Sequence, residues 1–397
     1  MPASTDELLA RLLDGIAREE QRALELRRRL HAQPELAHAE RATAEAIAAE
    51  LPVASVTDAG TGRLARIGPG DRAPVAVRAE LDALPIRERT GAPFSARGEA
   101  MHACGHDVHM AALVALARAA HAIADQLPAP LLVVFQPSEE AYPSGAELLA
   151  HGRLAEIRPA AIVAAHVHPE IEWGAVALDA GTVNAASDSV EITVEGRPAH
   201  GAYPHRGRDP VLALAQIVVS LHAQLGRRVD PFGPAIVNVG VIEGAGAENV
   251  IPERARARAA LRAYRSEDRE ALRQMAVEVV EGIAAAHGCR GRAEIIAGEP
   301  ALENDALIVA GTRRLLDSSG FALVPEWRSC GSDDIAFLGA LAPLAVAFVG
   351  LAGADGFNAR PLHHPELLPP DAAVAQVARV QAALYVAAAA AAQTTDR

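Results

Sequence analysis

The chain has 397 residues, of which 50% are hydrophobic, 22% charged and 3% aromatic. This length allows two domains that each bury a core, and the low aromatic share leaves those cores to Ala, Val, Leu and Ile. The net charge of −13 argues against a basic nucleic-acid-binding face. All 37 Lys-or-Arg positions are Arg, which excludes Schiff-base, pyridoxal-phosphate and P-loop nucleotide sites because each needs a Lys.

Three features predict a cytoplasmic protein. Residues 1–20 carry several charges and lack the apolar core of a secretory signal. No apolar run reaches the ~18 residues of a membrane span. The three cysteines (Cys104, Cys289 and Cys330) are too few and too scattered for a disulfide framework. In a reducing compartment, a special thiol is more often a ligand or a nucleophile than part of a disulfide.

The first part of the chain predicts an α/β domain. Residues 6–51 repeat apolar side chains at helical spacing, with a break near Gln33-Pro34, and predict two helices. Short apolar runs then alternate with longer helical patterns. The expected strands are residues 74–78, 131–135 and 161–165, and the helices between them are residues 111–127 and 146–155. This alternation predicts a mostly parallel sheet with helices on both faces.

The pattern changes near residue 185 to alternating strands and two helices in the order β-α-β-β-α-β. The expected elements are residues 189–195, 210–225 (helix), 235–241, 254–264, 267–287 (helix) and 292–296. This order is typical of a ferredoxin-like α+β sandwich. The chain then returns to the first domain with a helix at 305–318, a strand at 345–349 and a helix at 371–392. We therefore predict a catalytic domain of residues 1–186 and 299–397 around an inserted domain of residues 187–298.

Polar residues follow each of three apolar strands in the first domain. Glu80 and Asp82 follow the first strand, Glu139 and Glu140 the second, and His166 the third. Ligands of open α/β sheets bind beyond the carboxyl ends of the strands. These side chains are therefore expected to gather at one edge of the sheet.

A denser polar cluster, Met-His-Ala-Cys-Gly-His-Asp-Val-His, covers residues 101–109 directly before a helix. Cys104 and His106 are two residues apart, so their side chains face the same way in an extended segment, and a thiolate with an imidazole suits Zn²⁺. Another cluster, Pro-Leu-His-His-Pro, covers 361–365. Alone, the 101–109 cluster could also be a polar loop that caps a helix, and an adjacent glutamate pair or a single histidine after a strand is more often a solvated pair of charges or a hydrogen-bonded structural residue. Together, buried charges at this density require a metal or tight pairing.

These motifs resemble the aminoacylase-type metallopeptidases, in particular their hippurate-hydrolase-like amidohydrolase subgroup, which includes bacterial aminoacylases and auxin-conjugate hydrolases. The resemblance covers nearly the whole chain. The matching strings are Arg-Arg-Leu-His-Ala-Gln-Pro-Glu-Leu (28–36), Arg-Ala-Glu-Leu-Asp-Ala-Leu-Pro (78–85), Met-His-Ala-Cys-Gly-His-Asp (101–107), Gln-Pro-Ser-Glu-Glu (136–140), His-Val-His-Pro (166–169), Gly-Arg-Pro-Ala-His (196–200), Pro-His (204–205), Asn-Val-Ile-Pro (249–252), Gly-Ser-Asp-Asp (331–334) and Leu-His-His-Pro (362–365).

The resemblance implies a centre of two divalent metal ions, zinc or else manganese, cobalt or nickel. Its ligands would be Cys104, His106, Glu140, His166 and His363, with the thiolate of Cys104 bridging the ions. His364 is an alternative to His363, although the His-x-Pro spacing of the family favours His363.

The resemblance also implies roles for four further residues. Glu139 would be the general base, and the carboxylate of Asp82 would orient a metal ligand. The inserted domain would form a homodimer, in which His200 reaches the partner's site and stabilises the oxyanion. Asn249 would contact the substrate.

Three positions depart from the family pattern. Gly-Ser-Asp-Asp-Ile at 331–335 replaces Gly-Ser-Glu-Asp-Phe, Ser138 replaces Ala, and Glu80 replaces Asp. The first of these lies near the expected pocket, so it bears on the choice of acyl group. None removes a predicted ligand or the base.

The sequence therefore predicts a metal-dependent hydrolase of the amide bond in small N-acyl amino acids. A dipeptidase or carboxypeptidase of the wider family is the main alternative. Two others are a non-catalytic protein that binds an amino-acid conjugate and a thiol hydrolase with Cys104 as nucleophile.

Overall fold

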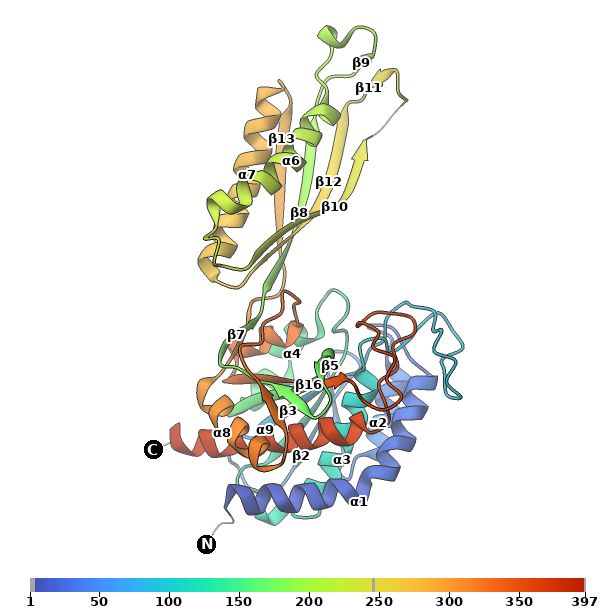
Figure 1. The fold of residues 1–397 in the computed structure, drawn as a ribbon, viewed down its shortest axis with the longest axis vertical. Coiled ribbons are helices and arrows are strands. Elements are labelled where there is room, and N and C mark those ends of the chain that lie inside the picture. The colour runs from blue at the N-terminus through green and yellow to red at the C-terminus, as the bar shows by residue number, and fades with distance from the viewer. Residues whose placement is uncertain (1–3, 245–246, 396–397) are drawn as a thin grey trace. The chain divides into compact units, whose positions relative to one another are not determined.

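The computed structural model describes residues 4–244 and 247–395, and they form two compact units (Figure 1). The larger unit takes the chain up to Gly181, Glu303–Trp327 and the chain from Asp334 onward. The smaller unit is Thr182–Leu302 with Arg328–Asp333. The smaller unit thus extends a few residues beyond each end of the predicted inserted domain of residues 187–298, and it also includes the separate segment Arg328–Asp333.

The larger unit contains an eight-stranded sheet in the order β1-β2-β4-β3-β5-β16-β6-β15. The strands are β1 (Val56–Asp58), β2 (Gly62–Ile67), β3 (Val75–Glu80), β4 (Leu131–Gln136), β5 (Ala161–Glu172), β6 (Ala175–Ala177), β15 (Ala322–Val324) and β16 (Leu344–Ala352). The central strands β4, β3, β5 and β16 are parallel, whereas β1 and β2 run antiparallel at one end. The expected mostly parallel sheet is confirmed, and its central strands end at one edge.

Helices flank this sheet. They are α1 (Thr5–Ala32), α2 (Arg41–Glu50), α3 (His106–His121), α4 (Gly145–His151), α5 (Arg153–Ile157), α8 (Ala306–Ser318) and α9 (Ala373–Thr395), with 3-10 turns η1 (Ala124–Gln126) and η3 (Asp334–Ala340). A capping box of Ser4 and Glu7 begins α1. Helices α1, α3 and α9 pack together and, with one face of the sheet, bury the main apolar core (Figure 1).

Two predicted helices differ in the structure. Helix α3 begins at His106 rather than at residue 111, because Gly105 at its N-cap has a φ of +87° and lets the chain turn directly into the helix. The first turn is polar and fully buried, so hydrophobic periodicity gave no sign of it. The helix expected at 146–155 is split at Gly152, where the carboxylate of Asp58 accepts hydrogen bonds from the first amides of α5.

One helix meets the length and hydropathy of a membrane span. Ala373–Thr394 of α9 has a mean hydropathy of 1.3, although Gln376, Arg379 and Gln381 interrupt its apolar residues. The search for an uninterrupted apolar run therefore did not single it out. However, 78% of that window is buried, and the helix packs against α1, α3, α8 and β5. Helix α9 is therefore a core helix of the larger unit.

The smaller unit contains a four-stranded antiparallel sheet in the order β10-β12-β8-β13, with two helices packed on it. Its elements are β8 (Ala186–Glu195), α6 (Pro210–Arg228), β10 (Ala235–Gly244), β12 (Arg254–Ala263), α7 (Ser266–Ala286) and β13 (Arg290–Ala297). This is the predicted β-α-β-β-α-β order. The remaining elements are β7 (Gly181–Asn184), β14 (Leu302–Asn304), the two-stranded ribbon of β9 (Ala199–His200) and β11 (Val250–Ile251), and η2 (Pro204–Arg206).

Candidate metal centre

The predicted ligands converge at the carboxyl edge of the parallel strands in the larger unit. Cys104, His106 and His166 offer one ligand atom each, and these atoms lie within 4.8 Å of one another. Cys104, Glu140 and His363 form a second such group. Cys104 belongs to both groups, which is the arrangement that a bridging ligand requires.

Backbone contacts position His363. The amide of His363 donates to the carbonyl of Ala103 at 2.8 Å, and His363 adopts a φ of +64°. Its Nε2 lies 3.1 Å from Oε1 of Glu140. Nδ1 of His364 instead accepts the amide of Glu366, and His364 joins no ligand group within the described ranges. Geometry therefore favours His363 over His364.

Backbone carbonyls fix the tautomers of two histidines. Nδ1 of His106 donates to the carbonyl of Asp82 at 2.8 Å, and Nδ1 of His166 donates to the carbonyl of Val167 at 2.6 Å. Each Nε2 therefore carries a lone pair, as a metal ligand must. Nε2 of His166 lies 3.5 Å from Sγ of Cys104, whereas the buried Nε2 of His106 has no hydrogen-bond partner among the described residues.

The electrostatics of the cluster suit a bound cation. Burial, followed by the charges of Glu140 and Glu139, raises the pKa of the Cys104 thiol well above its usual value. Burial also lowers the pKa of His166 far below its usual value and keeps that imidazole neutral. A thiolate at Cys104 therefore requires positive charge beside it, and a thiolate, neutral imidazoles and a carboxylate are the donor set of zinc sites. The residues fit a divalent metal.

Glu139 and Asp82 lie next to these donors. Oε2 of Glu139 is 3.8 Å from Nε2 of His106, and its side chain is 15% exposed. The carboxylate of Asp82 is fully buried and accepts the amide of Glu140 at 2.9 Å. Asp82 thus contacts two predicted ligands. Its carboxylate accepts the amide of Glu140, and its main-chain carbonyl accepts the hydrogen bond from His106.

The family model of peptidase family M20/M25/M40 matches residues 76–386 of the chain. The chain belongs to this family. An N-acetyl-L-cysteine deacetylase of Bacillus subtilis is 34% identical over 352 residues, which cover 87% of this chain and 83% of that protein. An N-acetyldiaminopimelate deacetylase of Bacillus licheniformis is 31% identical over 314 residues, which cover 78% of this chain and 82% of that protein.

Solved structures agree with this assignment. A dinuclear metal binding peptidase of the M20 family from Bacillus subtilis aligns with a TM-score of 0.81 and 27% identity, over 93% of this chain and 98% of that one. A Staphylococcus aureus protein described as an aminohydrolase aligns with a TM-score of 0.88 and 27% identity, over 95% and 98%. The family resemblance is confirmed, and this M20 chain is an amide hydrolase.

The two site residues predicted in the inserted domain lie in the smaller unit. His200 pairs with Val250 in the β9–β11 ribbon, and its Nδ1 accepts the amide of Ala202 at 3.1 Å. The carbonyl of Asn249 accepts the amide of Gly201 at 2.6 Å. Both side chains are exposed. Their roles toward substrate stay predictions.

A buried polar network lies next to the predicted ligands. Glu80 and His109 stand in the predicted polar clusters, but the contacts that join them to each other and to the rest of the network were not predicted. Nδ1 of His109 donates to Glu80 at 2.7 Å, and Nε2 of His109 accepts the amide of Val167 at 3.0 Å. Glu80 pairs with Arg78, whose Nη2 lies 2.8 Å from Asp334. His109 uses both nitrogens and so supports the neighbouring His166 ring, 4.5 Å away, rather than acting as a ligand.

The loop that carries Glu139 and Glu140 is held at both ends by Asp334. Gln136, before the loop, donates to Asp334 at 2.8 Å, and Ser144, after it, donates to the same carboxylate at 2.7 Å. Within the loop, the amide of Ser138 donates to Glu40 at 2.8 Å.

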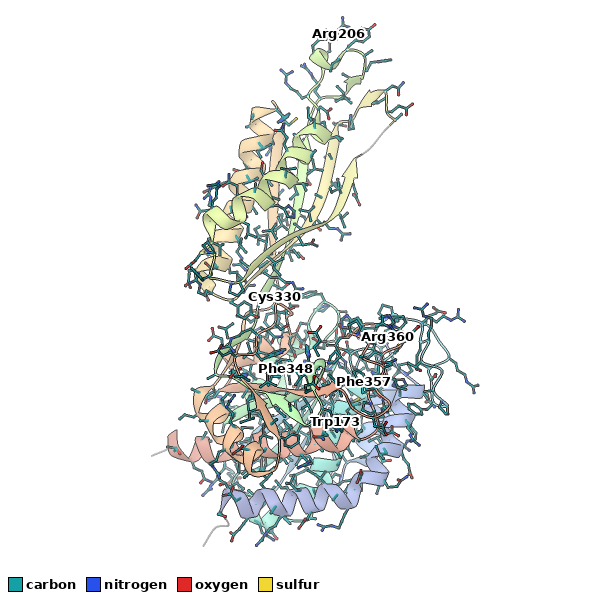
Figure 2. The ribbon with its side chains drawn as sticks, viewed as in Figure 1. Trp173, Arg206, Cys330, Phe348, Phe357 and Arg360 are labelled. Carbon is teal, nitrogen blue, oxygen red and sulfur yellow. The ribbon has the colours of Figure 1, made fainter. Side chains whose placement is uncertain are left out.

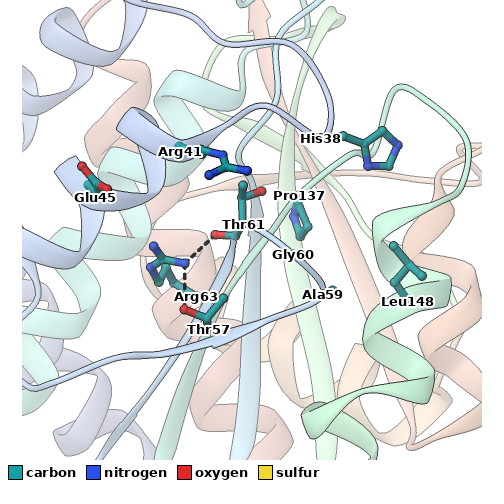
Figure 3. A pocket seen from close by; sticks show the side chains of 10 residues that line it. All are labelled: His38, Arg41, Glu45, Thr57, Ala59, Gly60, Thr61, Arg63, Pro137 and Leu148. Carbon is teal, nitrogen blue, oxygen red and sulfur yellow. Dashed lines mark hydrogen bonds between the residues drawn. The ribbon is translucent and has the colours of Figure 1, made fainter.

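A cavity of about 460 Å³ lies behind this loop (Figure 3). It is lined by His38, Arg41, Glu45, Thr57, Ala59, Gly60, Thr61, Arg63, Pro137 and Leu148. None of the predicted metal ligands lines it. Nε2 of His38 lies 3.0 Å from Oγ of Ser138, so one wall of the cavity contacts the loop that carries Glu139.

Proposed function

We propose that the chain hydrolyses the amide bond of small N-acyl amino acids at a centre of two divalent ions, with Glu139 as general base. The observation that carries this proposal is the pair of ligand groups that share Cys104, with Glu139 beside them. The deacetylase names of the relatives support an N-acyl amino acid as the substrate.

Cys104, His106, Glu140, His166 and His363 would hold the ions. A thiolate with imidazoles and a carboxylate favours zinc, and manganese, cobalt or nickel are the alternatives to test. When bound, such ions polarise a carbonyl and lower the pKa of water.

Glu139 would move the proton. Its carboxylate takes a proton from the attacking water and delivers it to the amine that leaves. The partial exposure of the Glu139 side chain leaves room for substrate beside it, whereas the carboxylate of Glu140 contacts Nε2 of His363. Asp82 would position both neighbours of the base. Its carboxylate accepts the amide of Glu140, and its main-chain carbonyl accepts Nδ1 of His106.

We further propose that the enzyme is a cytoplasmic homodimer joined through the smaller unit. Helix α6 presents an apolar stripe to solvent, in which Val211, Leu212 and Val219 are 42%, 52% and 68% exposed. Ile242 on the edge strand β10 is 62% exposed. Exposed apolar side chains on a helix beside a free sheet edge suit a self-complementary interface. His200 would then stabilise the oxyanion in the partner's site, and Asn249 would contact the substrate.

The test is a panel of N-acyl amino acids assayed before and after chelation, followed by addition of Zn²⁺, Mn²⁺, Co²⁺ or Ni²⁺. We expect chelation to abolish hydrolysis and one metal to restore it. Elemental analysis of Cys104→Ala should show less bound metal, while the matched variant Cys289→Ala in the smaller unit should bind as much as the wild type. Activity that survives complete metal removal would instead favour Cys104 as a nucleophile.

A peptidase of the same family is the second candidate, because the similar Bacillus subtilis structure is described as a peptidase. Free dipeptides in the same assay separate the two functions. Faster hydrolysis of free dipeptides than of every N-acyl amino acid would replace the proposed substrate class.

A further inference from the structure

Two arginines line the cavity behind the loop between β4 and α4. Arg41 reaches it from the first turn of α2, and Arg63 reaches it from β2 (Figure 3). Nη1 of Arg63 donates to Oγ1 of Thr57 at 3.1 Å and to two main-chain carbonyls, and these contacts fix its guanidinium. Nε and Nη2 of Arg63 and the whole guanidinium of Arg41 make no hydrogen bond or ion pair with the residues that the structure describes. These donors are available to a ligand.

An exposed arginine alone is no sign of a site. Arg360, which Figure 2 labels, simply pairs with Glu366 at 2.7 Å. Arg41 has a carboxylate at the spacing of a helical ion pair, Glu45, but within the described part of the chain the two side chains do not pair. Arg41 differs from other exposed arginines because it shares one concave surface with a second cation, Arg63.

The cavity has the size and charge of a site for a small anion. Its volume of about 460 Å³ lies within the range of small-molecule sites, roughly 300–1,000 Å³. Among the described residues that line it, Glu45 is the single acid against Arg41 and Arg63, so positive charge is in excess although the chain carries −13. A concave surface with an excess of one charge concentrates ions of the other. A guanidinium matches carboxylate and phosphate groups with two parallel N–H donors.

Two hydrogen-bonded routes join the wall of this cavity to Ser138, the residue before Glu139. In the first, Nε2 of His38 lies 3.0 Å from Oγ of Ser138. In the second, Oγ1 of Thr61 donates to Oε2 of Glu40 at 2.7 Å, and Oε1 of Glu40 accepts the amide of Ser138 at 2.8 Å. Glu40 is fully buried and lies behind the wall. A displacement of either wall residue is therefore passed to the backbone beside the proposed base.

The backbone of this segment depends on such contacts. Ser138 has a φ of +50° and His38 a φ of +65°, which is the left-handed region that residues other than glycine rarely adopt. A residue stays in that region only where its surroundings hold it. The contacts from the cavity wall are part of what holds Ser138, so they also influence where Glu139 lies.

We propose that this cavity is a second binding site, which takes the carboxylate or phosphate group of a small anion on Arg41 and Arg63, and that its occupancy changes turnover through Ser138. Binding is independent of the reaction, whereas the effect on turnover rests on the proposed function. An anion on the two guanidinium groups contacts the wall that Thr61 and His38 help to form. It thereby biases the contacts that hold the loop.

Binding is measured by calorimetry on the full chain, with acetate as the carboxylate probe and inorganic phosphate as the phosphate probe, at an ionic strength held constant with chloride. We expect a Kd on the order of 1 mM or tighter for at least one probe, and the tighter one identifies the class of anion. Arg41→Gln and Arg63→Gln should each weaken binding by about tenfold or more. Arg41 has no partner among the described residues, so its variant should fold like the wild type.

Two further variants locate the anion. Arg66→Gln is the matched control, because Arg66 is exposed on the same strand β2 but does not line the cavity. Cys104→Ala alters the proposed metal centre, and both variants should bind the probe with wild-type affinity. A wild type that binds neither probe, or Arg41→Gln with undiminished affinity, would overturn the site. Loss of binding in Cys104→Ala alone would place the anion at the metal centre instead.

The effect on turnover is measured at saturating N-acetyl-alanine, where an anion that merely competes with substrate no longer changes the rate. The bound probe should change kcat by a factor on the order of five in the wild type and leave it unchanged in Arg41→Gln. Ser138→Ala should reduce that factor without lowering the affinity for the probe.

An undiminished factor in Ser138→Ala, or a wild-type kcat that does not respond to the bound anion, would overturn the coupling. If no N-acyl amino acid is hydrolysed with metal supplied, the proposed function fails, whereas calorimetry still decides whether the anion site exists.

Discussion

Glu139 and Glu140 are adjacent in the chain but lie in different surroundings. Oε1 of Glu140 is 3.1 Å from Nε2 of His363. Burial by itself raises the pKa of Glu140, but the hydrogen bond from His363 and the charges of His106 and His363 together lower it below its usual value. Glu139 faces Nε2 of His106 at 3.8 Å. The chain bends at Glu139 and Glu140, and their two carboxylates face different histidines, which suits the proposed division into a ligand and a base.

Glu139→Gln keeps the shape of this side chain and removes its ability to accept a proton. We expect kcat to fall on the order of 10²-fold or more, with unchanged metal content. Steady-state kinetics and elemental analysis measure the two quantities. Glu147→Gln, on the exposed side of α4, is the matched control and should retain full activity. Near-normal turnover of Glu139→Gln would remove this residue as the base.

His31 contributes a pH-dependent term to stability. Burial by itself lowers its pKa, but Asp107, which contacts Nδ1 at 2.9 Å, and Glu88, which contacts Nε2 at 3.1 Å, together raise it to about 9. The unfolded value is near 6.5. The folded protein therefore holds a proton on His31 that the unfolded chain releases, and the stabilisation is complete below pH 6.5.

Raising the pH from 6.5 toward 9 should remove this stabilisation, which is on the order of 3 kcal/mol for a shift of this size. We expect the free energy of unfolding in urea to fall with pH more steeply for the wild type than for His31→Gln, which carries no such proton. Parallel pH profiles for the two proteins would show that His31 is neutral in the fold.

The residues that sequence reasoning found are those with local signals. Cys104 and His106 share one short string, and the glutamate pair follows an apolar strand. The contacts of the supporting network gave no such signal. Arg78 and Asp334 both lie in strings that carried the resemblance, but they are 256 positions apart and no sequence pattern pairs them. His363 and His364 have similar neighbours in sequence, and the hydrogen bond to Ala103 distinguishes them only after folding.

At the scale of elements, long strands and amphipathic helices were predictable, whereas short and polar elements were not. Strands β1, β6 and β15 have three residues each, too few for a period to be visible. The buried polar turn at the start of α3 also breaks the usual pattern, because its polar groups are satisfied by partners distant in the chain. Asp107, for example, pairs with Arg27 at 2.7 Å.

The loop between β4 and α4 depends on one carboxylate. Asp334 accepts from Gln136 before the loop and from Ser144 and the amide of Ala146 after it. Such a carboxylate fixes both ends of a segment whose middle carries Glu139. The position of Glu139, the proposed base, should therefore depend on Asp334, which the sequence did not predict as a metal ligand, although Glu139, Asp333 and Asp334 offer ligand atoms within 4.8 Å of one another.

Asp334→Asn should lower kcat by about tenfold or more while KM changes less, because a small displacement of a base costs reactivity before binding. The matched control is Asp58→Asn, another buried aspartate that accepts helix amides, at the start of α5 instead of this loop. We expect the control to lose thermal stability but keep its kcat per folded molecule. A wild-type kcat in Asp334→Asn would show that catalysis does not need Asp334.

At the scale of the whole molecule, the question is how the two units share one reaction. The larger unit contributes the predicted metal ligands and the base, and the smaller unit carries His200 on an exposed ribbon together with the apolar stripe of α6. In a symmetric dimer each protomer gives and receives the same contacts. If His200 serves the partner's site, the two defects of Glu139→Gln and His200→Ala lie in different sites of a mixed dimer.

Each variant alone should be inactive, and mixing them in equal amounts with exchange of subunits should restore roughly a quarter of the wild-type activity. Half of the dimers are then mixed, and one of the two sites in each combines an intact Glu139 with an intact His200. His205→Ala, an exposed histidine in the adjacent turn η2, should remain active by itself and serves as the matched control. Size-exclusion chromatography and differently tagged subunits establish that mixed dimers form. Mixed dimers without activity would show that His200 does not act across the interface.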